Sequence, residues 1–231
     1  MRGPSVFITE NTDKGWTAPE LIRSIPANIW APWSPCLSPD ANSIFFTRSL
    51  LKPLIKRNLY RCNRTVRGWA EPQQLGPPLS SPAKEITCSI AANNSIYIGS
   101  TRKRIPGKSG VWIAPFVDST WTRVERVALN FPAGDMGIAP DESFMVFTDK
   151  DLPGGYGHRD LYLTLRLPDG TWSKPQNLGP RINTAYIEHG PRISPDKKYL
   201  FFNRSNGWDT RKHSADIYWV ELKEYLPESY R

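Results

Sequence analysis

Short apolar segments recur along the chain at regular intervals, and each follows a turn of small and polar residues. The segments are 43–46, 95–98, 144–147 and 199–202. The turns before them are Ser38-Pro39-Asp40, Asn93-Asn94, Ala139-Pro140-Asp141 and Ser194-Pro195-Asp196. Short apolar runs bounded by turn residues indicate buried strands, whereas helices need longer periodic stretches. The pattern therefore predicts an all-β chain built from repeats.

Tryptophans mark the same repeat. They stand at positions 16, 69, 121 and 172, with separations of 53, 52 and 51 residues. Each begins a strand-like segment after a turn, and the last of these turns, Pro168-Asp169-Gly170, has the residues that tight hairpins favour. A strand with an aromatic residue recurs at 58–60, 110–112, 160–162 and 216–218, and 6–8 is a fifth copy. A fixed period of this length is the signature of a repeat protein.

Together the markers describe a unit of four antiparallel strands: strand A, a Pro-Asp turn, strand B, a long loop, strand C, a short turn, and strand D starting at the tryptophan. A unit of about 52 residues with this content is one blade of a β-propeller. We therefore predict one all-β propeller domain over 1–231. Its units are 1–28 (partial), 29–81, 82–132, 133–184 and 185–231 (partial). Five blades with an incomplete first one are favoured, and four blades, with the two termini sharing one, are the alternative.

These repeats resemble the TolB-like, WD-like propeller family of bacteria over almost the whole chain. The most specific segment is 138–220, with IAPDESFMVF, GGYGHRDLYLTLRLPDGTWSKPQNLGPRIN, ISPDKKYLFF and DIYWV. The second copy departs from the pattern, because it has Ala92-Asn93 where Pro-Asp is expected. The resemblance implies a binding module with a protein or peptide partner, located in the periplasm or at the cell surface.

The composition supports many short strands, with 22 prolines, 16 glycines and 12% aromatic residues in 231. The first residues, MRGPSVFITE, have no basic start followed by an apolar run, so the sequence as given predicts no export signal. No apolar stretch of about eighteen residues occurs, so no transmembrane segment is predicted. The lack of an export signal in the given sequence predicts a cytoplasmic protein, whereas the resemblance implies the periplasm or the cell surface. The sequence therefore leaves the cellular compartment open.

The three cysteines, Cys36, Cys62 and Cys88, are odd in number and lie in strand-like segments. None has the C-x-x-C spacing of a zinc or redox site. We interpret them as reduced residues of the core.

Basic residues are concentrated in one part of the chain. The formal charge is +8, and 41–110 holds twelve Lys or Arg against Glu71 and Glu85. In a propeller the B–C loops share one face, so these charges would form a basic rim that attracts an anionic partner. The plainer alternative is a set of solvated loops. The basic residues of the loops are Arg48, Lys52, Lys56, Arg57, Arg102, Lys103, Arg104 and Lys108.

Acidic residues recur near the mouth of the predicted channel. Glu85 and Glu188 each follow the leucine of an L-G-P motif by ten residues, and Asp135 lies at a similar level of the third unit. With His189 and Arg192 they would bind a small ligand, or coordinate calcium or another hard cation. The alternative is that each carboxylate accepts local backbone or arginine hydrogen bonds. No other cofactor is predicted.

Aromatic and histidine residues of the same face, Tyr156, His158 and Trp208, are candidates for partner recognition. A metal site formed by the three histidines, which lie on loops of different blades, is a weaker candidate. Other recurring residues are expected to be structural. The tryptophans would pack between blades and the aspartates would fasten turns: Trp16, Trp69, Trp121, Trp172, Asp160 and Asp216.

Catalytic motifs are missing from the sequence. There is no G-x-S-x-G elbow, Walker loop, dinucleotide fingerprint or metalloprotease helix. We therefore favour a non-catalytic module that binds a protein or peptide through its B–C loop face. The alternative is a carbohydrate-binding protein, or a glycoside hydrolase that uses the channel carboxylates. Nucleic acid is a weaker candidate, since basic charge alone gives unspecific attachment.

Overall fold

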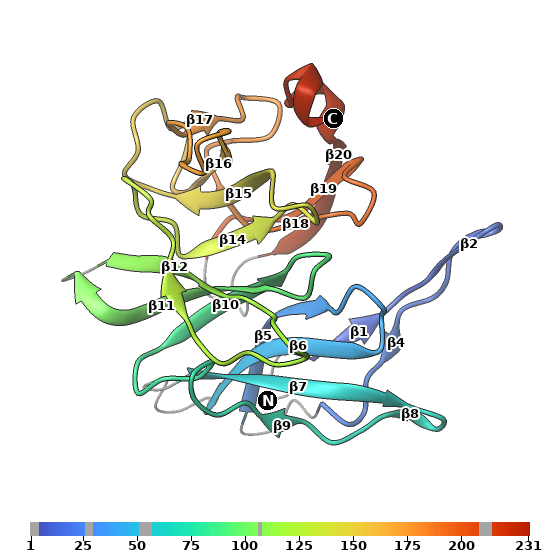
Figure 1. Ribbon diagram of the computed structural model, residues 1–231. Coiled ribbons are helices and arrows are strands. Elements are labelled where there is room, and N and C mark those ends of the chain that lie inside the picture. Colours follow the sequence, from blue (N-terminus) through green and yellow to red (C-terminus); the bar gives the residue numbers. More distant parts are fainter. Residues whose placement is uncertain (1–4, 26–29, 51–56, 106–107, 208–213) are drawn as a thin grey trace.

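The computed structural model describes residues 5–25, 30–50, 57–105, 108–207 and 214–231. Four antiparallel sheets are arranged as a ring, which confirms the predicted β-propeller (Figure 1). Apart from two 3-10 turns, Leu222–Glu224 and Glu228–Tyr230, the elements of the described residues are strands. No helix in these segments is long and apolar enough to cross a membrane.

Each of the first three blades has A, B and C strands of 4 to 10 residues, followed by one or two segments of 2 residues at the position of strand D. The first contains β5 (Trp30–Leu37), β6 (Ser43–Leu50), β7 (Arg57–Thr65), β8 (Gly68–Trp69) and β9 (Gln73–Gln74). The second contains β10 (Glu85–Ile90), β11 (Ile96–Ile105), β12 (Lys108–Ala114) and β13 (Glu125–Arg126). The third contains β14 (Asp135–Ile138), β15 (Phe144–Asp149), β16 (Asp160–Leu165) and β17 (Gln176–Asn177).

The fourth blade is three-stranded, with β18 (Ile187–Ile193), β19 (Tyr199–Ser205) and β20 (Ala215–Glu221). Within the described chain, β20 pairs only with β19, so the position of a D strand is not filled by a strand. The C-terminal 3-10 turns follow instead, and Leu222 and Leu226 are buried against the third and fourth blades.

The N-terminal unit is a ribbon, not a blade. Strand β1 (Phe7–Ile8) pairs with β4 (Glu20–Leu21), and the hairpin β2 (Asn11–Thr12) and β3 (Gly15–Trp16) projects from the ring (Figure 1). Phe7 opposite Leu21 repeats the register of Tyr60 opposite Gln74 in the first blade. The ribbon thus corresponds to strands C and D alone. Four blades are detected, and the unit that we counted as an incomplete fifth is this pair of strands.

The A–B turns have one conformation in all four blades. A residue with positive φ occupies the same turn position in each: Ala41, Asn94, Glu142 and Lys197. In the second blade, which lacks Pro-Asp, the Asn93 side chain accepts a hydrogen bond from the Ser95 amide, as Asp40 does from Asn42 in the first. Asparagine therefore replaces aspartate in the turn without changing it.

The core consists of layers between neighbouring units. Apolar side chains of strands B and C of one unit pack on strands A and B of the next, because each sheet must bury both faces. Phe46 and Cys62 contact the N-terminal ribbon, and Phe45 and Leu59 contact the second blade. Met136 and Phe147 lie between the second and third blades, and Phe202 lies between the third and fourth.

Candidate functional site

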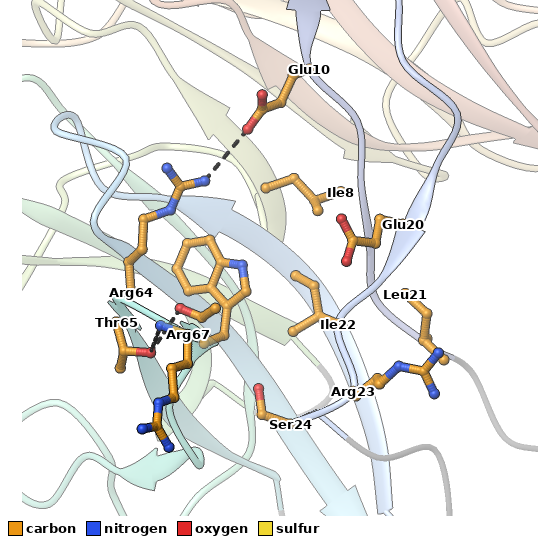
Figure 2. A pocket seen from close by; sticks show the side chains of 12 residues that line it. Ile8, Glu10, Glu20, Leu21, Ile22, Arg23, Ser24, Arg64, Thr65 and Arg67 are labelled. Carbon is orange, nitrogen blue, oxygen red and sulfur yellow. Dashed lines mark hydrogen bonds and ion pairs between the residues drawn. The ribbon is translucent and has the colours of Figure 1, made fainter.

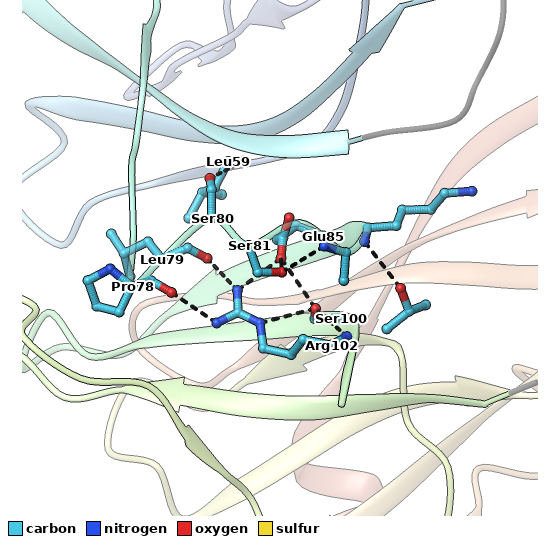
Figure 3. A network of polar contacts seen from close by, with 11 residues as sticks. Leu59, Pro78, Leu79, Ser80, Ser81, Glu85, Ser100 and Arg102 are labelled. Carbon is cyan, nitrogen blue, oxygen red and sulfur yellow. Dashed lines mark hydrogen bonds and ion pairs between the residues drawn. The ribbon is translucent and has the colours of Figure 1, made fainter. Parts of the chain in front are cut away.

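Glu85 lies at the start of strand A of the second blade and is fully buried. Arg102 reaches it from strand B with an N–O distance of 2.9 Å, and the Ser81 and Ser100 hydroxyls donate to the same carboxylate oxygen (Figure 3). Arg102 also donates to the carbonyls of Pro78 and Leu79. The network fastens the D–A connection to strands A and B.

Glu188 repeats this arrangement in the fourth blade. Its carboxylate is fully buried and accepts from Arg204 at 2.8 Å and from the hydroxyl and amide of Thr184. Arg204 also donates to the carbonyl of Ile182. Both glutamates therefore have local arginine partners. This is the geometry expected if each carboxylate accepts local backbone or arginine hydrogen bonds instead of binding a ligand. Their binding of a ligand stays a prediction.

Asp135 faces a different environment at the same end of the channel. One carboxylate oxygen accepts a hydrogen bond from the Gly190 amide of the next blade at 2.9 Å, and the other is buried without a hydrogen bond among the described residues. Burial lowers the pKa of the neighbouring His189, and the Asp135 charge opposes this effect. Burial also lowers the pKa of Arg57, again opposed by Asp135. Asp135 thus favours the charged forms of two groups from other blades, an effect that is smaller than that of burial in both cases.

Arg192 crosses the channel from the fourth blade. Its guanidinium donates to the carbonyls of Met136 at 3.2 Å, Pro191 at 2.8 Å and Pro35 at 3.4 Å. These carbonyls belong to strands A of the third, fourth and first blades. Arg192 also lines a cavity at the A–B turn end of the channel, and Glu85, Glu188 and Asp135 are not in the lining of that cavity. A shared ligand site of these residues stays a prediction.

The basic residues that we placed on the rim are only partly described. Arg57 donates to the Ile86 carbonyl and lies over the Trp33 ring at 4.9 Å, and Arg48 lies over Tyr60 at 5.6 Å. With Arg102, these arginines extend along the blades rather than into solvent. Lys52, Lys56 and Trp208 lie outside the described residues, as do the side chains of Lys103, Arg104 and Lys108.

Exposed aromatic side chains gather at the B–C loop end. Tyr156 is 49% exposed in the loop after β15, and Tyr186 is 51% exposed before β18. The His158 amide donates to the Tyr186 carbonyl at 3.0 Å, so the two loops are adjacent. Trp33, 39% exposed at the same end of β5, has no repeat marker and was missed from the sequence.

The recurring tryptophans differ in environment. Trp69, Trp121 and Trp172 pack against the layers between units, whereas Trp16 is 61% exposed. The difference arises because the β2–β3 hairpin projects away from any neighbouring blade.

The two aspartates also differ. Asp160 is buried and accepts from the amides of Tyr156 and Gly157 and from the Asn177 side chain, so it fastens the B–C loop to strand D. Asp216 is exposed on β20, where a strand D partner is missing among the described residues.

Three surface cavities among the described residues differ in volume. One of about 410 Å³ lies between the N-terminal ribbon and the β7–β8 hairpin, where Glu10 pairs with Arg64 at 3.5 Å (Figure 2). One of about 240 Å³ lies beside the D strand of the second blade. The largest, about 640 Å³, is at the A–B turn end of the channel and is lined by apolar residues of the ribbon and all four blades, with Arg192. We call it the channel cavity.

Cys36 lines the channel cavity, and its sulfur lies 3.4 Å from that of Cys88. The sequence interpretation treated the cysteines singly and missed this pair. A signal was present, because the two are 52 residues apart, close to one repeat length, and therefore lie at similar levels of neighbouring A strands. Aligned by their A–B turns, Cys36 corresponds to Ser89, the residue after Cys88. Within the described chain, no group of three or more His, Cys, Asp or Glu side chains is placed to hold a metal ion.

Comparison with known proteins identifies the fold class alone. No protein-family model matches the chain, and no curated protein sequence matches it. TolB from Acinetobacter baumannii is similar with a TM-score of 0.52 and 14% identity over 81% of this chain, which spans 42% of that protein. A chain of a nidogen/laminin complex gives 0.55 and 9% over 96% of this chain and 84% of that one.

An α-L-arabinanase of Penicillium chrysogenum complexed with arabinobiose gives a TM-score of 0.52 and 10% identity, over 95% of this chain and 68% of that one. The fold is thus shared by propellers that bind proteins and propellers that hydrolyse sugars. This protein is a β-propeller, and its similarity to TolB is one of structure.

Proposed function

We propose that this propeller is a non-catalytic module that binds a protein or peptide partner through its B–C loop face. The observation that carries the proposal is the commitment of Glu85 and Glu188 to buried ion pairs with Arg102 and Arg204. A glycoside hydrolase needs two carboxylates flanking the substrate, one as acid and one as base or nucleophile. Because both glutamates are ion-paired internally, although Glu85 Oε2 has no hydrogen bond among the described residues, the surface chemistry favours recognition over catalysis.

The aromatic residues of this face are suited to recognition. Trp33, Tyr156 and Tyr186 are exposed on a rigid scaffold, and aromatic side chains provide large contact areas with a polar group for orientation. Interfaces are enriched in such residues for the same reason. The likeness to a chain from a nidogen/laminin complex supports a protein partner.

A library of random peptides displayed on phage, panned on the immobilised protein, tests the proposal. We expect enriched peptides whose affinity, measured by calorimetry, falls at least about tenfold in Tyr156→Ala or Trp33→Ala, since a central aromatic residue contributes more than about 1.4 kcal/mol. The matched control is Trp16→Ala, an exposed tryptophan on the projecting hairpin. Equal loss in the control, or no enrichment, would contradict the proposal.

Carbohydrate binding is the second candidate, favoured by the Asp135 oxygen that is buried without a hydrogen bond among the described residues. The likeness to an arabinanase complexed with arabinobiose supports it. Titration with an oligosaccharide panel, followed by tryptophan fluorescence, separates the two candidates. Saturable binding that Asp135→Asn abolishes would favour carbohydrate, whereas a flat response across the panel leaves the peptide proposal.

A further inference from the structure

Two free cysteines meet at the wall of the channel. Cys36 lies in β5 of the first blade and Cys88 in β10 of the second, and their sulfur atoms are 3.4 Å apart. A disulfide has a sulfur–sulfur distance of about 2.05 Å, so an approach of about 1.4 Å would join them. The approach would come from side-chain rotation together with a shift of the strands.

The two thiols differ in access. Cys36 is half-buried and lines the channel cavity of about 640 Å³, which opens to solvent. Cys88 is fully buried in the layer between the first and second blades and also approaches the Ser34 carbonyl at 3.8 Å. A reagent of small size would therefore reach Cys36 first, and Cys88 would follow.

The electrostatic environment assigns the same order. The hydrogen bond with Cys88 lowers the pKa of the Cys36 thiol, burial opposes this, and the Arg192 charge adds to the lowering. The same hydrogen bond, together with burial, raises the pKa of Cys88. Thiolate is the nucleophilic form of cysteine, so Cys36 is the attacking group and Cys88 the resolving group.

The third cysteine is an internal comparison. Cys62 is buried in the layer between the N-terminal ribbon and the first blade, where its thiol donates to the Ala70 carbonyl at 2.6 Å. Burial raises the pKa of this thiol, and its hydrogen-bonding neighbours are Ala70 and Ser24. It has neither the cavity nor the second sulfur that distinguishes the pair.

We propose that Cys36 and Cys88 form a thiol–disulfide exchange site that links the first two blades when a small disulfide enters the channel cavity. The Cys36 thiolate attacks one sulfur of the small disulfide, and the other sulfur leaves as a thiolate. Cys88 then loses its proton and attacks the Cys36 sulfur, which releases the second small thiol. Two protein thiols and one small disulfide become one protein disulfide and two small thiols, so electrons and atoms balance.

The new disulfide would hold the first and second blades together. It joins residues 52 apart in the chain, so it restricts the unfolded ensemble and stabilises the folded protein. It also draws the Cys36 sulfur from the cavity wall toward the blade interface, so the cavity that a ligand meets differs between the two redox states. The site thereby couples the redox state to the A–B turn end of the channel.

Oxidised glutathione is the probe for the test. The folded protein is incubated with it, remaining thiols are alkylated, and tryptic peptides are identified by mass spectrometry. We expect a linked pair of peptides containing Cys36 and Cys88, with Cys62 alkylated. A linkage through Cys62, or three alkylated thiols after an incubation that oxidises the denatured chain, would overturn the proposal.

Variants separate the two steps. Cys88→Ser is expected to stop at a stable glutathione adduct on Cys36, and Cys36→Ser to gain none, whereas Cys62→Ser keeps the wild-type linkage. The midpoint of thermal unfolding of the wild type should rise by about 5 °C on oxidation and return with dithiothreitol. An unchanged midpoint in the disulfide-linked protein would contradict the proposed stabilisation by the disulfide. Peptide mapping of the wild type decides the linkage even where a variant does not fold.

Discussion

At the scale of single residues, the repeated glutamates show how burial determines the role of a carboxylate. Glu188 has no exposed surface, and its partner Arg204 is 18% exposed. Removing one member of a buried ion pair leaves the other charge desolvated and uncompensated, which costs more than the pair contributes. The same residue type on the surface has water as an alternative partner.

Glu188→Ala is expected to lower the free energy of unfolding by about 3 kcal/mol, because Arg204 would keep its burial and lose its carboxylate. Denaturant unfolding measures the change. The control is Glu221→Ala, which breaks the exposed pair with Lys223 and should change the free energy by no more than about 0.5 kcal/mol. Similar losses in both variants would mean that the Glu188 network contributes nothing beyond a surface contact.

His189 supplies a pH dependence. Burial lowers its pKa, Asp135 opposes this, Arg159 adds to the lowering and Glu188 opposes it. The unfolded chain therefore binds a proton at His189 where the folded protein does not. This contribution to stability is complete above about pH 6.5 and is lost as the pH falls through the folded pKa.

Between about pH 7.5 and pH 5, the midpoint of thermal unfolding should fall more steeply in the wild type than in His189→Gln, which removes the proton-binding group. Calorimetry across that range provides the measurement. His158→Gln, in which an exposed imidazole is removed, should keep the wild-type slope. If the midpoint fell more steeply in His189→Gln than in the wild type, the charged imidazole would stabilise the fold, and the predicted direction of the pH dependence would be wrong.

At the scale of elements, the sequence was sufficient to predict where the strands lie, but not which side chains interact with one another. Turn chemistry and apolar runs are local signals, so strands B and C appear at the predicted positions in every blade. Even the Asn93 turn, without Pro-Asp, has the same positive φ as its counterparts. The D strands proved shorter than expected, with two residues each. In the second and third blades they begin at Glu125 and Gln176, four residues after the tryptophan at which strand D was expected to start.

Side-chain partners depend on contacts that no local pattern contains. Arg102 was assigned to a binding loop from its position, yet its strand continues past Ser100 and directs the guanidinium to Glu85. Cys36 and Cys88 meet because two A strands run side by side in the ring. Repeat spacing is the sequence feature from which such pairs can be inferred, since residues about one period apart lie at similar levels of neighbouring blades.

The fourth blade has an exposed edge, because no D strand pairs with its strand C among the described residues. The first three blades cover strand C with a D strand, whereas β20 presents Ile217 and Trp219, 76% and 59% exposed. Exposed apolar strands promote association with other chains. The edge of the fourth blade is therefore open to association among the described residues.

At the scale of the whole molecule, the A strands converge on the channel, and their spacing limits the radius of the ring. Gly137 in β14 lies so close to the neighbouring strand A that an added Cβ would be 2.6 Å from the Pro191 carbonyl oxygen. The obstructing atoms are backbone, which cannot rotate away. Only a residue without a side chain permits this approach between the third and fourth blades.

Gly137→Ala should therefore lower the free energy of unfolding by about 2 kcal/mol, since the strands must separate and the layers on both sides lose contact. The matched control is Gly76→Ala, where nothing lies within 4 Å of the added Cβ, and its stability should stay the same or rise slightly. Denaturant unfolding of both variants measures the difference. If Gly137→Ala behaves as Gly76→Ala does, the ring can widen freely, and its radius is determined by the layers between blades rather than by the strands at the channel.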